Sequence, residues 1–227
     1  MHRMKYAGWL VVLASLLLLA ACNGTNKEAS ESPQPTEGQS QEEQPYEENP
    51  NEEQSVEGTP PTVLEAATTV MRALKDGNMR TLAAWAHPDK GIRFSPYAYV
   101  DTKKDLVFSR QELKGLMDES EVREWGTMDG SGELIKLKYA DYHKRFVYDA
   151  DFFKDAEISL NEQLGKGNTI NNLNDVYPKA NHNFVEYYIE GTDPEVKGMD
   201  WRSLRLVFEK IGEDQALVGI IHDQWTI

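Results

Sequence analysis

His222 and Asp223 stand side by side at the end of the last predicted strand, and Arg205 lies on the strand expected next to it. Histidine and carboxylate side chains are the usual general acids and bases of enzymes, because their pKa values can be brought near neutral pH. If a pocket opens at this end of a sheet, these three residues can supply the polar groups at its mouth.

The chain is also rich in tyrosine and tryptophan, beyond what a small core can bury with every O–H and N–H hydrogen-bonded. Some rings are therefore expected to line a concavity, although each one can instead pack in the core with its polar tip at the surface. The candidate pocket residues are Trp85, Tyr97, Tyr99, Trp125, Tyr142, Tyr187, Trp201, Arg205, His222, Asp223 and Trp225.

Recognised catalytic, metal and cofactor motifs are not evident in the sequence. The histidines have no metal-ligand spacing, and the calcium-like start at Asp129 is followed by Leu134 where such a loop needs glycine. Ile170 stands where a third glycine would complete a dinucleotide fingerprint begun at Gly165, and Ser131 lacks the frame of a nucleophile elbow. We therefore expect no metal and no cofactor.

The N-terminus has the order of a secretory signal. Arg3 and Lys5 precede an apolar run from Gly8 to Ala21, which is shorter than the roughly 20 residues that cross a bilayer. The run ends in Leu19-Ala20-Ala21-Cys22, which resembles the bacterial lipobox. This resemblance implies cleavage after Ala21 and a diacylglycerol on the Cys22 thiol, so that residues 1–21 are a signal peptide. A simple signal peptide or an uncleaved signal anchor are the alternatives.

Residues 22–61 are expected to form an acidic tether. From residue 23 to 61 they include ten glutamates against a single lysine and consist mostly of polar residues, proline and glycine, a composition that cannot offset its own ordering entropy. A specific acidic ligand for a basic surface is the alternative interpretation. The following residues, 62–227, have a size typical of one globular domain. Both parts are negatively charged, which argues against nucleic acid as a partner.

The globular part predicts helices first and strands last. Thr62 with Glu65 forms a capping box for a helix to about Lys75, Asn78 can cap a second helix, and Ser109 with Glu112 can cap a third. A fourth helix is expected at residues 139–148, although residues 134–138 alternate like a strand, and residues 125–132 and 164–178 are expected to be loops. Residues 203–211 and 216–222 predict an antiparallel hairpin. This order predicts an α+β fold, in which the helices pack on one face of a curved antiparallel sheet.

This order of elements resembles the NTF2-like (cystatin-like α+β) superfamily. The stretches Gly198-Met199-Asp200-Trp201 and His222-Asp223-Gln224-Trp225, together with the lipobox, are also similar to uncharacterised lipoproteins of Gram-positive bacteria. The superfamily resemblance implies a cone with a pocket at its open end, which serves as enzyme site, ligand site or dimer interface in different members. Fold alone does not choose among these uses.

Two functional hypotheses follow. The first is a lipid-anchored module on the extracytoplasmic face of the cell membrane that binds an unknown small ligand or docks to a cell-envelope protein. The second is an enzyme that uses His222 and Asp223 as an acid–base pair in an aromatic pocket. The two differ in whether those side chains share one cavity.

Overall fold

The computed structural model describes residues 59–226. The predicted signal peptide, the lipidation site at Cys22 and residues 22–58 of the predicted tether lie outside the described residues. Between residues 59 and 226, no helix combines the length and the apolar character needed to cross a bilayer.

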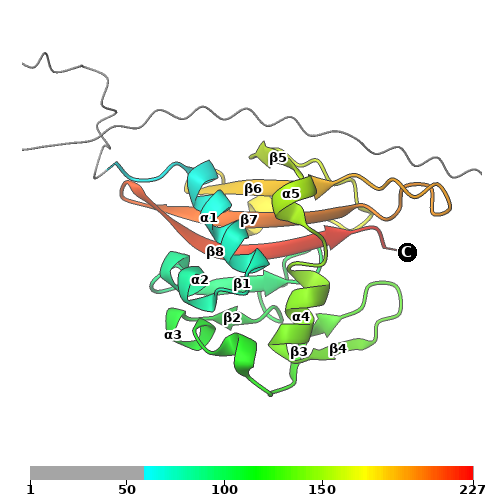
Figure 1. Ribbon diagram of the computed structural model, residues 1–227, viewed down its shortest axis with the longest axis horizontal. Coiled ribbons are helices and arrows are strands. Elements are labelled where there is room, and N and C mark those ends of the chain that lie inside the picture. The colour runs from blue at the N-terminus through cyan, green and yellow to red at the C-terminus, as the bar shows by residue number, and fades with distance from the viewer. Residues whose placement is uncertain (1–58, 227) are drawn as a thin grey trace, which may run out of the picture. The chain divides into compact units, whose positions relative to one another are not determined.

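Most helices before β5 gather on one face of the sheet (Figure 1), whereas the short helix after β5 packs against the opposite face. Helix α1 (Val63–Lys75) begins with the predicted capping box, in which Thr62 and Glu65 bond reciprocally, and α2 (Met79–Trp85) is capped by Asn78. Ser109 and Glu112 form the second predicted capping box, before α3 (Arg110–Leu113). The remaining helices are the 3-10 helix η1 (Leu116–Asp118), α4 (Tyr139–Phe146), α5 (Phe152–Asp155) and α6 (Leu173–Val176).

A six-stranded sheet carries the fold, with strand order β2-β1-β8-β7-β6-β5. Its strands are β1 (Ile92–Ser95), β2 (Val107–Phe108), β5 (Glu157–Leu160), β6 (His182–Ile189), β7 (Arg202–Ile211) and β8 (Asp214–Gln224). The predicted C-terminal hairpin is confirmed as β7 and β8. The α+β class is likewise confirmed, but β1 pairs parallel to β8, so the sheet is mixed rather than wholly antiparallel.

A separate hairpin pairs β3 (Arg123–Thr127) with β4 (Leu134–Leu137). The prediction of a loop at residues 125–132 is therefore wrong for its first part, because Trp125 lies within β3. Gly126, with φ of 115°, sits where the pairing register shifts, so here glycine marks a bulge rather than the end of a strand. Leu134–Leu137 does form the strand that its alternation indicated.

The main core lies between the helices and the sheet. Trp125 stacks on Tyr142 with ring centroids 3.8 Å apart, and Phe94 meets both rings edge-on. Leu204 and Leu206 of β7 and Ile220 of β8 contribute the sheet side of this core. The cone interior that the resemblance implies is thus filled by side chains.

The opposite face of the sheet has a smaller core. Val207, Phe184 and Ile221 pack there against Leu173 of α6 and Tyr177 at the end of that helix, both in the long segment between β5 and β6. Strand residues alternate between the two faces, so β7 contributes Leu206 to one core and Val207 to the other. The long irregular segment predicted from its glycine and asparagine content is thereby packed against the sheet.

Candidate functional site

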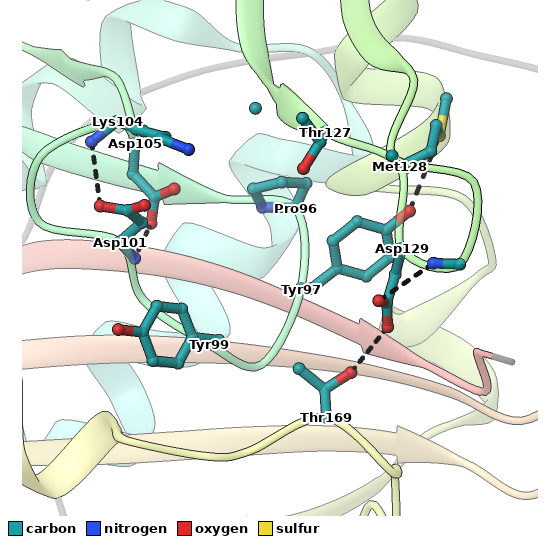
Figure 2. A pocket seen from close by; sticks show the side chains of 13 residues that line it. Pro96, Tyr97, Tyr99, Asp101, Lys104, Asp105, Thr127, Met128, Asp129 and Thr169 are labelled. Carbon is teal, nitrogen blue, oxygen red and sulfur yellow. Dashed lines mark hydrogen bonds between the residues drawn. The ribbon is translucent and has the colours of Figure 1, made fainter.

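A pocket of about 410 Å³ opens between the chain that leaves β1 and the turn that joins β3 to β4 (Figure 2). It is lined by Pro96, Tyr97, Tyr99, Asp101, Lys104, Asp105, Gly126, Thr127, Met128, Asp129, Gly130, Gly132 and Thr169. Its volume is within the range of small-molecule sites, and its wall combines rings with a few polar groups.

The acidic side of the pocket is a turn held by its own hydrogen bonds. The backbone N–H of Asp105 donates to the carbonyl of Asp101 at 2.9 Å, and Asp101 Oδ1 accepts from the N–H groups of Lys103 and Lys104. Aspartate suits such a turn because its short side chain bonds to backbone groups two or three residues ahead. The turn lies between β1 and β2, and the hydrogen bond from Ser95 Oγ to Asp105 Oδ2 holds its last carboxylate at the end of β1.

Asp105 is the most deeply placed ionisable group of the pocket, with only 9% of its surface exposed. Its Oδ2 accepts from Ser95 Oγ at 2.5 Å and from the N–H of Asp101 at 2.9 Å, whereas no hydrogen bond within residues 59–226 uses Oδ1. Burial raises the pKa of Asp105 to about 6, against the lowering effects of Ser95, Asp101 and Arg93. A buried carboxyl with a raised pKa beside a cavity is typical of a functional site.

Two tyrosines give the pocket its aromatic wall. Tyr97 is fixed from behind, since its ring meets Phe146 edge-on at 5.8 Å and its O–H contacts Met128 Sδ at 3.7 Å. Tyr99 is 49% exposed and lies at the rim. One ring is therefore held rigidly by the core, while the other is free to adapt to an occupant.

The far wall comes from the β3–β4 turn and from the irregular segment. Asp129 Oδ1 accepts from the N–H of Gly130, and its Oδ2 accepts from Thr169 Oγ1 at 3.1 Å. Figure 2 shows Asp129 and Met128 across the opening from Asp101 and Asp105. A second hollow of about 330 Å³ shares Tyr99, Asp129 and Thr169 with the pocket and continues it along the surface.

This arrangement can bind and orient a small molecule through carboxylate oxygens, hydroxyl groups and ring faces. Among residues 59–226, no three histidine, cysteine, aspartate or glutamate side chains are grouped closely enough to hold a metal ion.

Of the eleven predicted pocket residues, Tyr97 and Tyr99 line this pocket. Trp125, Tyr142 and Tyr187 are instead buried in the main core, and Trp85 lines a different hollow of about 400 Å³ near Ile211. Trp225 is half-buried near the end of the chain. The sequence identifies the aromatic residues, but it does not show which of them stay at the surface when the chain folds.

His222 and Asp223 do not share a cavity. Both are buried, but as neighbours on β8 they face opposite sides of the sheet. His222 lies on the helix side, where its Nδ1 is 3.2 Å from the carbonyl oxygen of Pro96 and its Nε2 is 3.2 Å from Asp149 Oδ2. The acid–base pair expected from their adjacency is therefore not formed, because the pleat of the strand separates the two side chains.

Asp223 belongs to a buried charge network on the other face. Arg205 Nη2 lies 2.9 Å from Asp223 Oδ2 and 2.9 Å from Glu186 Oε1, and Ser203 Oγ also donates to Glu186. Burial raises the pKa of Asp223, although Arg205 opposes the shift. Trp201 closes over this network from the end of the sheet.

Asp105, Ser95 and Thr169 were not among the pocket residues expected from the sequence. Residues 101–105 are a polar run, but the burial of Asp105 depends on a contact with Ser95, ten residues earlier, and on the β3–β4 turn opposite. The aspartates at both ends of this run are the one local signal, and they indicate a turn rather than a buried carboxylate.

Comparisons with known proteins give similarity of fold only. No protein-family model matches the chain, and no curated protein matches it by sequence. Among solved structures, it is similar to an NTF-2 like protein of unknown function from Shewanella oneidensis MR-1, with 10% identity over 71% of this chain and 96% of that one, at a TM-score of 0.32. A putative calcium/calmodulin dependent protein kinase II association domain from Xanthomonas campestris shows 12% identity over 71% and 84% of the two chains, at a TM-score of 0.28.

Proposed function

We propose that this chain is a lipoprotein anchored on the extracytoplasmic face of the cell membrane, and that its globular part binds a small molecule in the pocket beside Asp105. The observation that carries the binding function is the 410 Å³ pocket itself, whose lining includes a carboxylate that is only 9% exposed together with two tyrosines. Buried polar groups are costly unless they are used, so a half-engaged carboxylate at a cavity favours a ligand.

The anchoring part of the proposal is supported by the N-terminal sequence. The run Leu19-Ala20-Ala21-Cys22 resembles a lipobox, and two acyl chains hold a protein on a bilayer where a single chain is marginal. The acidic residues 23–61 make attachment by charge to anionic lipid unfavourable.

Anchoring is tested with Cys22→Ser in a bacterial host that lipidates exported proteins. The unchanged chain is expected to incorporate labelled palmitate and to sediment with membranes, whereas the variant takes up no label. Labelling of the variant, or an unmodified sulfur in the unchanged chain by mass spectrometry, would overturn the anchoring proposal.

Binding is tested with the full-length protein in detergent, against a library that contains cationic, neutral and anionic small molecules. Hits are expected to raise the melting temperature and to lose that effect in Tyr99→Ala, because this ring lies at the rim of the pocket. Val122→Ala is the matched control, since Val122 is also exposed (57%) but does not line the pocket. A library without hits, or hits unaffected by Tyr99→Ala, contradicts the proposal.

The enzyme hypothesis loses its specific residues. His222 and Asp223 face opposite sides of the sheet, and His222 lies in the core beside Phe146. Binding is therefore the function that the geometry supports best.

A further inference from the structure

The pocket has more negative than positive side chains in its lining, and this difference indicates the charge of the ligand it can bind. Three carboxylates, those of Asp101, Asp105 and Asp129, line it against one ammonium, that of Lys104. The two sides differ in burial as well: Asp105 is 9% exposed, whereas Lys104 is an exposed side chain on the rim. An exposed ammonium stays hydrated, so its electrostatic interaction with a neighbouring charge is weak. A carboxylate in a cavity interacts more strongly with a charged ligand, because the effective dielectric constant there is lower.

The free oxygen of Asp105 sets the geometry of recognition. Because Ser95 and the Asp101 backbone both bond to Oδ2, the carboxylate cannot turn without breaking two hydrogen bonds, and Oδ1 is held as an acceptor. A hydrogen bond from a cationic donor to such an oxygen is stronger than one from a neutral donor.

The aromatic wall favours the same kind of ligand. The face of a tyrosine ring carries partial negative charge and attracts cations, and it also packs well against carbon. Tyr97 is held by its contact with Phe146, Tyr99 lies at the exposed rim, and both rings line the same pocket as Asp105.

Building on the proposed binding function, we infer that the pocket recognises a small organic molecule through a protonated primary or secondary amine. The ammonium donates to Asp105 Oδ1, and the carbon skeleton packs on Tyr97 and Tyr99. Asp129, whose two oxygens are engaged by Gly130 and Thr169, adds long-range attraction without itself being the main acceptor.

Binding of this kind depends on pH. Burial raises the pKa of Asp105 to about 6, so the carboxylate is ionised at pH 7.5 and mostly protonated at pH 5. An aliphatic amine remains protonated throughout, and the ligand is therefore released as the pH falls through 6. The other titratable or charged groups around Asp105 are Arg93 on β1, Asp101 and Lys104 in its own turn, Asp129 across the pocket, Tyr142 on α4 and Tyr177 after α6.

Matched probes test the inference. Benzylamine, benzyl alcohol and benzoate have the same ring with a cationic, neutral or anionic end, and benzyltrimethylammonium is a cation without an N–H donor. Binding to the full-length protein is followed at pH 7.5 by NMR of the backbone amides of Gly126 and Thr169. Benzylamine is expected to bind about tenfold more tightly than benzyl alcohol, with benzoate weakest and benzyltrimethylammonium weaker than benzylamine.

Three variants locate the effect. Asp105→Asn is expected to abolish the preference for benzylamine, Asp89→Asn to leave it unchanged because Asp89 is exposed and does not line the pocket, and Lys104→Gln to strengthen it about twofold. Lowering the pH from 7.5 to 5 is expected to weaken benzylamine binding about tenfold in the unchanged protein and hardly at all in Asp105→Asn.

The outcomes separate the two proposals. Equal or tighter binding of benzyl alcohol or benzoate at these amides overturns the inference about the amine but leaves ligand binding intact, as does a preference that survives Asp105→Asn. If none of the probes shifts these amides, the amine inference is wrong. If the library also contains no compound whose effect on the melting temperature is lost in Tyr99→Ala, the proposed binding function is wrong as well.

Discussion

The two faces of the six-stranded sheet are stabilised in different ways. The helix side is filled with apolar and aromatic side chains, centred on Trp125 stacked against Tyr142. The opposite side has a smaller apolar cluster and, beside it, two groups of buried polar residues. One is Arg205 with Glu186 and Asp223, and the other is Ser95 with Asp105.

This difference separates stability from function. Apolar burial contributes steadily to folding, whereas buried charges compensate one another only when every partner is in place. The pocket lies next to one of these polar groups, Ser95 with Asp105, and borders the aromatic core through Tyr97, so its buried ionisable residue comes from the face that is harder to stabilise. Five changes, some with a matched control, test whether the two faces behave differently.

The largest effect is expected for Arg205→Ala. Removing the guanidinium leaves Glu186 and Asp223 buried without their cation, which is expected to lower the free energy of unfolding by about 3–5 kcal/mol at pH 7.5. The loss is expected to be smaller at lower pH, because burial raises the pKa of Asp223 and the variant lacks the guanidinium that opposes this shift, so that protonation of Asp223 removes its buried charge. Urea denaturation followed by tryptophan fluorescence measures both values.

Trp125→Ala is the matched change on the helix side. It is expected to cost a similar 3–5 kcal/mol, because it leaves a cavity beside Tyr142, but with no dependence on pH between 5 and 7.5. If the two variants show the same pH response, the contrast between a charged and an apolar face is incorrect.

Asp105→Asn is expected to change how stability depends on pH. The folded protein holds a proton on Asp105 up to about pH 6, whereas the unfolded chain loses it near pH 4, so the unchanged protein loses stability as pH rises through this window. The loss is about 3 kcal/mol in full, because the pKa differs by about two units between the folded and unfolded states and each unit corresponds to about 1.4 kcal/mol. Asparagine carries no such charge, so the stability of the variant relative to the unchanged protein is expected to increase by most of this amount between pH 4 and pH 7 in the same denaturation assay. Parallel pH curves would rule out a raised pKa at Asp105.

Gly167→Ala probes the cover over the charge network. A methyl group at this position would lie 3.0 Å from Asp223 Oδ1 and 3.3 Å from the Trp201 ring, so these two side chains must give by a few tenths of an ångström, at a cost of about 1–2 kcal/mol where they are tightly packed. Gly115→Ala is the control, because nothing lies within 4 Å of its added carbon. Comparison of the two melting temperatures is the measurement, and equal values would mean that the cover is loosely packed.

The smallest effect is expected on the helix side. Tyr142 O–H is buried with no hydrogen-bond partner among residues 59–226, so Tyr142→Phe is expected to raise the free energy of unfolding by up to about 1 kcal/mol. Tyr187→Phe removes a hydroxyl that bonds to Thr68 and is expected to lower it by about the same amount. A loss of stability in Tyr142→Phe, measured by urea denaturation, would show that its hydroxyl is used.

Local patterns predicted the elements well where one segment decides its own structure. The capping boxes at Thr62 and Ser109 begin helices as expected, and the C-terminal hairpin forms where alternation and its polar turn placed it. Trp125 was assigned to a loop because Gly126 follows it, yet pairing with β4 extends the strand through that glycine as a bulge.

The candidate site was less predictable, because it too depends on contacts between segments that are distant in the sequence. Tyr97 and Tyr99 were among the expected pocket residues, but Asp105 was not, since its burial depends on Ser95 and on a turn that comes later in the chain. His222 and Asp223 are adjacent in sequence, and the alternation of side chains along β8 places them on opposite faces of the sheet. The predicted strand ended at residue 222, so this alternation was not applied to Asp223.

The sequence by itself determined the ends of the early helices, the alternating strands and the acidic composition of the chain, because caps and periodicity act within a few residues. Tertiary structure alone decided which aromatic rings are buried, which side of the sheet receives Arg205 and Asp223, and where a pocket remains. Those outcomes depend on strand register and on contacts between distant segments, such as the parallel pairing of β1 with β8.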